Sequence, residues 1–387
     1  MMTDGVNTRE LVLEILLEVT KEQEFSHIAI RNVLEKYSYL SRQERAFIKR
    51  LSEGTIERRI ELDYLIDQIS KTKTAKMKPV IRNILRMGAY QLKYMDSVPE
   101  RAACNEAVKL AVRKGFSGLK GFINGVMRNL SRRIHEISLP DERTEPENFL
   151  SVKFSMPEWL VADWVNTYGY ERTREMFQAF LEPAVTSVRT NLLRITPEEL
   201  TERLRAEGVT VRVNPKVPYG LFLSDYDSLG ALETFEEGLF YVQDTASMLA
   251  VEQADVKPGS YVIDVCAAPG GKSVHMAEKL AGTGMVEARD LTEYKVQMME
   301  ENMDRMQLSN MRAVCRDARV LDPDSVEQAD VVIADLPCSG LGVIGRKPDI
   351  KYRMTPEKIR ELAALQREIL GVVQQYVKPG GLLMYST

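Results

Sequence analysis

The sequence contains few cysteines, histidines and tryptophans. Its 387 residues include four cysteines, three histidines and two tryptophans. The cysteines lack the paired spacing of zinc sites, and the histidines do not cluster with them. We therefore expect reduced thiols, no bound metal and a cytoplasmic protein. The four cysteines are Cys104, Cys266, Cys315 and Cys338.

Long hydrophobic runs are also absent. No apolar stretch approaches the roughly 18 residues that mark a membrane-spanning helix. The first ten residues have neither a basic segment followed by an apolar one nor a twin-arginine pattern. We expect a soluble, unexported protein with no membrane partner. With 44% apolar residues, a chain of this length can build two or three domains, each with its own core.

Basic and acidic residues are unevenly distributed. The net charge is −4, but residues 1–140 hold 25 Lys and Arg against 17 Asp and Glu, which leaves 27 against 39 for the remainder. The excess lies within residues 71–140, which have 15 basic and 4 acidic side chains. Such a segment suits a nucleic-acid phosphate backbone. A solvated basic surface without a partner is the alternative.

One stretch, residues 261–272, organises the C-terminal half. It reads YVIDVCAAPGGK and predicts a buried strand, a glycine turn and the start of a helix. In an open α/β sheet, ligands bind at such strand-to-helix turns, and glycine lets the backbone approach them closely. A P-loop ending at Ser273 would need glycine in place of Cys266, and no G-x-G-x-x-G pattern is present. A purely structural turn is the alternative.

Aspartates end four successive predicted strands. They are Asp264, Asp290, Asp317 and Asp335. A carboxylate after the second strand suits a ribose diol, because it accepts hydrogen bonds from both hydroxyls. One after the third strand can accept a hydrogen bond from an adenine amino group. Any single aspartate could be a helix cap or turn former, but four in succession predict one nucleoside site.

Two motifs together resemble the S-adenosylmethionine-dependent RNA cytosine-5 methyltransferases. They are DVCAAPGGK at 264–272 and DLPCSG at 335–340. The resemblance implies a Rossmann-like domain with S-adenosylmethionine as cofactor. It also implies the cofactor-binding residues, which are Cys266, Ala267, Ala268, Pro269, Gly270, Gly271, Lys272, Asp290, Asp317 and Asp335.

The resemblance also implies a reaction. Cytosine C5 is a poor nucleophile, so a thiolate must add to C6 before C5 can take the methyl group. Asp335 stands where the family places the carboxyl group that stabilises this addition near N3. Cys338 stands where the family places the cysteine that assists product release, and a buried, inert cysteine is the alternative.

The family takes its attacking cysteine from a later Thr-Cys motif that follows the fifth strand. This sequence ends at Thr387, one residue before the position of that cysteine. We therefore expect a C-terminally incomplete chain whose Rossmann-like domain lacks its last strands. We also expect this chain to be inactive by itself.

The N-terminal region predicts an all-helical bundle. Apolar spacing predicts several helices between residues 8 and 133, and Ser41 begins a capping box with Glu44. Segments 83–92 and 122–130 resemble the NusB-type RNA-binding domain. A NusB-like bundle fused to this methyltransferase is the arrangement of the Sun/Fmu (RsmB) type of 16S ribosomal RNA methyltransferases.

We therefore expect a multidomain α and α/β protein. Its segments are an all-helical NusB-like RNA-binding domain at 1–138, a polar linker with two prolines at 139–150, a small α+β RNA-binding insert at 151–238, and the Rossmann-like methyltransferase domain at 239–387.

Finer predictions concern single residues. Ser155 is expected to cap a helix that begins near Glu158. Gln243 and Asp244 are expected to shape the site rather than react. Asp349 and Lys351 lie in a loop that is expected to contact RNA, with a solvated turn as the alternative.

Three functions stay open at the level of sequence. The leading one is a monomeric enzyme that forms 5-methylcytosine in 16S ribosomal RNA, with the target base flipped into a pocket. The second is an amino-methylating enzyme of the same fold, which would want an aromatic residue where this chain has Cys338. The third is a non-catalytic NusB-type RNA-binding protein, which only the missing nucleophile supports.

Overall fold

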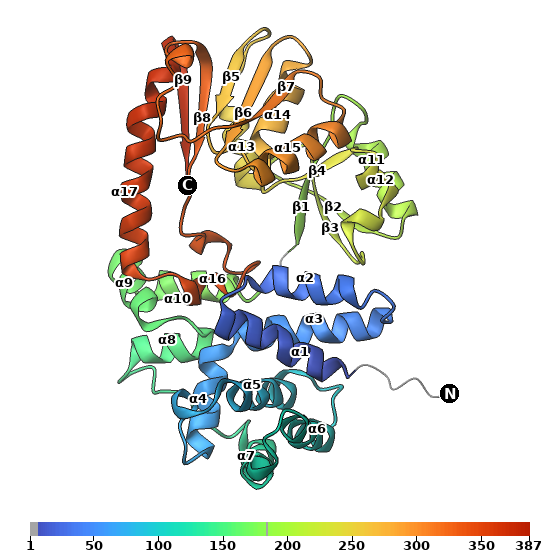
Figure 1. The fold of residues 1–387 in the computed structure, drawn as a ribbon, viewed down its shortest axis with the longest axis vertical. Helices are drawn as coiled ribbons and strands as arrows, with labels where there is room; N and C mark the ends of the chain where they lie inside the picture. The colour runs from blue at the N-terminus through green and yellow to red at the C-terminus, as the bar shows by residue number, and fades with distance from the viewer. Residues whose placement is uncertain (1–6, 183–184) are drawn as a thin grey trace. The chain divides into compact units, whose positions relative to one another are not determined.

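The contacts within the chain divide it into two compact units (Figure 1). In this computed structural model the described residues are 7–182 and 185–387. The helical unit comprises Met1–Pro183 and Gly340–Pro356, and the sheet unit comprises Ala184–Ser339 and Glu357–Thr387. Most of the N-terminal stretch inspected for export signals, residues 1–6, lies outside the described residues. The predicted domain boundaries stay predictions, because these units follow contacts rather than sequence families.

The helical unit confirms the predicted all-helical N-terminal region. Ser41 caps α3 through the predicted capping box with Glu44. Its helices are α1 (Thr8–Leu17), α2 (Ser26–Lys36), α3 (Arg42–Glu57), α4 (Arg59–Ile69), α5 (Pro79–Tyr94), α6 (Glu100–Arg113), α7 (Lys120–Arg133), α8 (Pro146–Phe154), α9 (Glu158–Tyr168), α10 (Tyr170–Ala179) and the late α16 (Ile350–Arg353).

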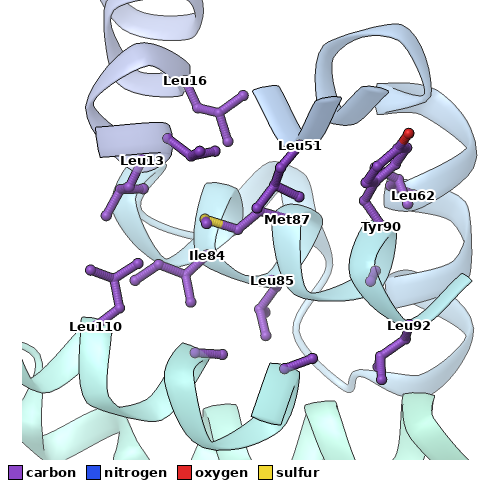
Figure 2. Packing of buried hydrophobic residues seen from close by; sticks show 14 of the residues in the cluster. Leu13, Leu16, Leu51, Leu62, Ile84, Leu85, Met87, Tyr90, Leu92 and Leu110 are labelled. Atoms are coloured by element: carbon purple, nitrogen blue, oxygen red, sulfur yellow. The ribbon is translucent and has the colours of Figure 1, made fainter. Parts of the chain in front are cut away.

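The core of the helical unit forms around α5 (Figure 2), which contacts α1, α3, α4, α6 and α7. Ile84, Leu85 and Met87 of α5 are at most 2% exposed. Burying one such side chain stabilises the fold by about 1.5–3 kcal/mol. At Gly54 of α3 the helices approach so closely that a Cβ atom would lie 2.0 Å from the ring of Tyr90. This core therefore fixes how α3 and α5 pack.

The segment 139–150 stays a predicted linker, and its last residues lie in α8, which begins at Pro146. Proline is favoured in the first helical turn, where its missing N–H costs no hydrogen bond. One local prediction in this region is wrong. Ser155 does not cap α9, whose N-cap is Pro157. Its Oγ instead accepts hydrogen bonds from the backbone N–H groups of Ile60 and Glu61, at 2.7 and 3.2 Å, and so caps α4.

The sheet unit begins with a four-stranded antiparallel sheet in the order β2-β3-β1-β4. A capping box between Thr196 and Glu199 starts its longer helix. This arrangement confirms the small α+β fold of the predicted insert. Its elements are β1 (Thr186–Thr190), α11 (Pro197–Ala206), β2 (Thr210–Val213), β3 (Gly220–Ser224), α12 (Glu233–Glu236) and β4 (Phe240–Val242).

A five-stranded parallel sheet follows, in the order β7-β6-β5-β8-β9. Strand β9 has only β8 as a neighbour within the described sheet. The elements are α13 (Thr245–Gln253), β5 (Tyr261–Asp264), α14 (Gly271–Leu280), β6 (Met285–Asp290), α15 (Glu293–Met306), β7 (Met311–Cys315), β8 (Ala329–Asp335), α17 (Pro356–Val373) and β9 (Val377–Ser386).

Helices cover both faces of this sheet. Because side chains alternate along a strand, Val262 packs with α14 and α15 on one face, while Ile263 packs with Ile369 of α17 on the other. Both faces are therefore apolar, as parallel sheets require. The arrangement confirms the predicted Rossmann-like domain. Within residues 7–182 and 185–387, no helix is long and apolar enough to cross a bilayer.

Candidate functional site

A cavity of about 160 Å³ opens at the carboxyl ends of β5 and β8, where the strand order changes direction. This switch point is where open α/β sheets bind their ligands. Seven of the residues predicted to bind a cofactor line it: Cys266, Ala267, Ala268, Pro269, Gly271, Lys272 and Asp335. Six further residues complete the lining: Tyr241, Val242, Gln243, Asp244, Ser247 and Asp264.

The turn after β5 forms one wall of the cavity. Gly270 has a φ of +105°, a conformation that side-chain-bearing residues rarely adopt, and it is the N-cap of α14. The Tyr241 hydroxyl donates a hydrogen bond of 2.9 Å to the carbonyl of Pro269. The backbone N–H of Ala268 donates one of 3.0 Å to Asp290. The turn is thus fixed from two sides.

Asp264 brings a buried carboxylate to the cavity. It is 1% exposed, and its Oδ2 accepts a hydrogen bond of 2.6 Å from Ser273. Its Oδ1 is buried and has no hydrogen bond of good geometry within the described residues, although the backbone N–H of Cys266 also interacts with this carboxyl and lowers its pKa. Burial raises the pKa of this carboxyl to about 7, and the nearby Asp335 adds to the rise. A buried acceptor without a partner costs free energy, so this site fits a ligand that brings a hydrogen-bond donor or a positive charge.

Lys272 and Asp335 form an ion pair across the cavity. The Lys272 Nζ lies 2.5 Å from Asp335 Oδ2, and the two side chains are 11% and 39% exposed. Ser386 of β9 donates a hydrogen bond of 2.7 Å to the other oxygen, Oδ1. Both oxygens of Asp335 are therefore held in place beside the cavity.

The two cysteines near the site differ in their surroundings. Burial, together with the charges of Asp264 and Asp290, raises the pKa of the Cys266 thiol to about 12. Cys266 therefore stays protonated and does not act as a thiolate nucleophile. Cys338 follows Asp335 by three residues and is exposed. The alternative of a buried, inert Cys338 is therefore wrong.

Three predicted cofactor residues do not line the cavity. Gly270 lies in the turn itself. Asp290 is 4% exposed and accepts hydrogen bonds from Ala268 and from Lys295. Asp317 accepts hydrogen bonds from Arg319. Their roles in binding a cofactor stay predictions.

The prediction for the loop after the second motif is wrong. Asp349 and Lys351 lie in the helical unit, where they are 2% and 0% exposed. Neither side chain is available to RNA, and neither belongs to a solvated turn. In the part of the chain that the structure describes, no group of three or more His, Cys, Asp or Glu side chains could hold a metal ion.

Sequence reasoning missed part of the lining. Asp264 is among the four strand-end aspartates of the predicted nucleoside site, but it is not among the cofactor-binding residues that the resemblance implies. Tyr241 and Ser247 carry no such signal. Ser247 reaches the cavity because α13 packs against α14, and Tyr241 reaches it because its hydroxyl bonds the carbonyl of Pro269.

Three family models match the chain. Residues 249–387 match the 16S rRNA methyltransferase RsmB/F family. Residues 6–132 match the NusB family. Residues 156–228 match the RsmF/B-like ferredoxin-like domain.

Curated relatives and solved structures are similar along most of the chain. The probable ribosomal RNA small subunit methyltransferase B of Bacillus subtilis is 35% identical over 98% of this chain and 84% of its own. That of Synechocystis is 32% identical over 99% and 85%. The crystal structure of PH0851 has a TM-score of 0.79 at 26% identity, covering 98% of this chain and 85% of its own. A methyltransferase homolog from Pyrococcus horikoshii has a TM-score of 0.53 at 27% identity, covering 60% and 74%.

The parallel sheet, the glycine turn and the charged cavity at its switch point define a Rossmann-like methyltransferase that uses S-adenosylmethionine. The unpaired Asp264 oxygen fits the positive charge that this cofactor carries. The chain belongs to the family of ribosomal RNA small subunit methyltransferases B.

Proposed function

We propose that this protein methylates C5 of a cytosine in 16S ribosomal RNA. The observation that carries the proposal is Asp335, which lines the cofactor cavity and precedes the exposed Cys338 by three residues. Membership in the RsmB family supports 16S RNA as the substrate. We further propose a monomeric, cytoplasmic enzyme without a metal.

The cofactor site follows from the cavity. When bound, S-adenosylmethionine supplies the methyl group on a positively charged sulfur. The predicted residues 266–272, with Asp290, Asp317 and Asp335, would hold it. Asp264 joins them, because its unpaired buried oxygen can accept a hydrogen bond from the amino group of the cofactor.

The basic segment supports RNA binding by the helical unit. Eleven of the fifteen Lys and Arg side chains in residues 71–140 are exposed. Exposed cations release counterions from a phosphate backbone, so RNA affinity should fall steeply with salt. Replacing both Arg132 and Arg133 by Glu should weaken RNA binding and flatten this salt dependence, while cofactor affinity stays unchanged.

The chemistry needs a thiolate that attacks C6 of cytosine. The resemblance implies an attacking cysteine from a Thr-Cys motif, and we propose that Cys338 assists elimination of that thiolate once the C5 proton has left. We also propose that Asp335, which lines the cavity, hydrogen-bonds near N3 of the base during the addition.

Tritium release tests this proposal and separates it from amino methylation. RNA labelled with tritium at cytosine C5 loses the label when C5 is methylated, whereas methylation of the exocyclic nitrogen leaves the label in place. We expect release from 16S RNA on incubation with the enzyme and S-adenosylmethionine. Asp335→Asn should lower the rate about 10²-fold or more, the range of a lost proton-transfer or charge-stabilising group.

Asp255→Asn is the matched control, because Asp255 is a carboxylate with 81% of its side chain exposed and lies outside the cavity. It should leave the rate unchanged. Methyl transfer without tritium release would favour the amino-methylating alternative. Absence of cofactor binding would favour the RNA-binding protein without catalysis.

A further inference from the structure

The segment that follows Cys338 is anchored in the helical unit. Gly340–Pro356 interrupts the sheet unit in sequence, since it lies between β8 and α17, but its contacts are with the helical unit. Only Ser339 separates Cys338 from this segment. Within two residues of the exposed Cys338, the backbone therefore enters the segment that packs in the helical unit.

Asp349 docks at the start of α2. Its Oδ2 accepts a hydrogen bond of 3.2 Å from the backbone N–H of Ser26, and its Oδ1 accepts one from the Ser26 hydroxyl. Helix α2 has no side-chain cap from its own N-cap residue, Phe25. A carboxylate at a helix N-terminus satisfies unpaired N–H groups and interacts favourably with the helix dipole. Asp349 thus caps a helix 323 residues away in sequence.

Arg353 extends this anchor by one helical turn. Its Nε donates a hydrogen bond of 2.9 Å to Asp349, and its other nitrogens donate to the carbonyls of Gln23 and Glu24. The guanidinium also lies 4.3 Å from the centre of the Phe25 ring. Asp349 and Arg353 together fix the segment to the turn before α2.

Lys351 and Tyr352 dock at the junction of α3 and α4. The Lys351 Nζ donates a hydrogen bond of 2.9 Å to the carbonyl of Glu57. The Tyr352 hydroxyl lies 3.0 Å from that carbonyl and 3.1 Å from the carbonyl of Ser155. The Arg59 guanidinium lies 3.6 Å from the centre of the Tyr352 ring. A buried lysine and a half-buried tyrosine with these partners make a rigid attachment.

The residues on the other side of Cys338 are also held. The backbone N–H of Leu336 donates a hydrogen bond of 3.0 Å to Ser386 of β9. Gln366 of α17 donates one of 2.8 Å to the carbonyl of Pro337. Cys338 therefore lies on the short span of chain that joins the end of β8 in the sheet unit to the segment docked in the helical unit. Fixing the backbone of a residue costs about 1–2 kcal/mol of entropy, and the docking contacts offset part of that cost before substrate binds.

We propose that Gly340–Pro356 is a positioning strap, whose docking through Asp349, Lys351, Tyr352 and Arg353 holds the Cys338 loop in its working conformation. This inference rests on the proposed function. These four are positioning residues, because they act on the reaction through the backbone. Weakening the strap lowers kcat and leaves cofactor affinity unchanged.

The test compares Lys351→Met with Lys21→Met. Lys21 is an exposed lysine of the same unit, with 65% of its side chain accessible, and serves as the matched control. Hydrogen exchange of the amides from Cys338 to Ile344 and alkylation of Cys338 are followed peptide by peptide, with the exposed Cys315 as internal reference. Lys351→Met should speed exchange about tenfold, as local opening becomes easier. It should also change the Cys338 alkylation rate at least about threefold, while Lys21→Met changes neither.

Tyr352→Phe keeps the test decisive if Lys351→Met fails to fold, because it removes only the hydroxyl. Both strap variants should lower kcat severalfold relative to the wild-type enzyme. The dissociation constant of the cofactor should stay within about twofold of the wild-type value. Unchanged exchange at 338–344 in a folded variant, or an unchanged kcat, overturns the strap. An inactive wild-type enzyme would overturn the proposed function alone, because the exchange and alkylation measurements do not depend on turnover.

Discussion

The cofactor cavity and the docking site of the strap both contain buried charged side chains, but these charges differ in how fully they are hydrogen-bonded. At the cavity, Asp264 keeps one oxygen without a hydrogen bond, and burial raises its pKa to about 7. At the docking site, Asp349 bonds Ser26 and Arg353, and Lys351 bonds Glu57. Buried charge alone therefore does not indicate a ligand site. A buried carboxylate beside a cavity does indicate such a site when, as in Asp264, one of its oxygens is unpaired.

The largest effect should come from removing a partnered charge. Asp349→Ala removes the side-chain acceptor at the N-terminus of α2 and the carboxylate bonded to Arg353, which should cost about 3–5 kcal/mol of unfolding free energy. Urea unfolding of the helical unit measures the loss. Glu35→Ala, which removes a carboxylate whose side chain is 70% exposed, should stay within about 0.5 kcal/mol. A loss below about 1 kcal/mol for Asp349→Ala would show that the two regions do not differ as described.

The pH dependence of stability should sharpen the comparison. Burial lowers the pKa of Lys351 from its usual value to about 7, against the attraction of Glu57. Between pH 7 and 10 the unfolded chain then binds more protons than the folded one at this position, so the unfolding free energy should rise with pH. The slope is at most about 1.4 kcal/mol per pH unit.

Lys351→Met should remove this rise. Urea titrations of the helical unit at pH 7 and pH 9 check it. Equal slopes for wild type and Lys351→Met would refute the assignment of this rise to Lys351.

The Asp264 carboxyl should act with the opposite sign, because its raised pKa makes the folded state bind more protons between about pH 4 and 7. Its contribution to the unfolding free energy of the sheet unit should therefore fall as pH rises through that range.

A smaller effect is expected from neutralising the unpartnered charge. Asp264→Asn should lower cofactor affinity about tenfold, the cost of one charge-assisted hydrogen bond. It should not lower the unfolding free energy of the sheet unit at pH 8, because the buried charge has an uncompensated cost there. Isothermal titration and urea unfolding measure both quantities. Asp255→Asn, at a carboxylate with 81% of its side chain exposed, is the control. Lost stability with intact affinity would reverse the distinction between the regions.

The smallest effect should come from one hydroxyl of the docking site. Tyr352→Phe keeps the ring under Arg59 and loses the hydrogen bond near Glu57 and Ser155. The unfolding free energy of the helical unit should fall by about 1 kcal/mol. A thermal melt resolves this change. Tyr39→Phe, at a tyrosine that is 70% exposed, should have no measurable effect.

Much of the sheet unit could be predicted from the sequence, because its signals are local. The run ending at Asp264 is β-branched and bounded by a glycine turn, and it forms β5 as expected. The thirteen residues that line the cavity could be predicted only in part. Those near the glycine turn share one motif, whereas Tyr241 and Ser247 come from separate elements. Their contribution depends on packing that no local pattern reveals.

The strap was the main failure of sequence reasoning. Asp349 and Lys351 are polar and follow a site motif, which is typical of an exposed binding loop. Their partners, Ser26 and Glu57, are about three hundred residues away in the chain. A single sequence carries no signal for such a pairing, and polar residues alone cannot distinguish a docked segment from an exposed one.

The distant capping of α2 has a consequence for synthesis. Asp349 leaves the ribosome 323 residues after Ser26, when β1 to β8 have already been made. During translation the start of α2 therefore lacks this cap until the segment that follows β8 has emerged. Pairings of such sequence separation form late. An N-terminal bundle made without that segment would lack the Asp349 cap on α2.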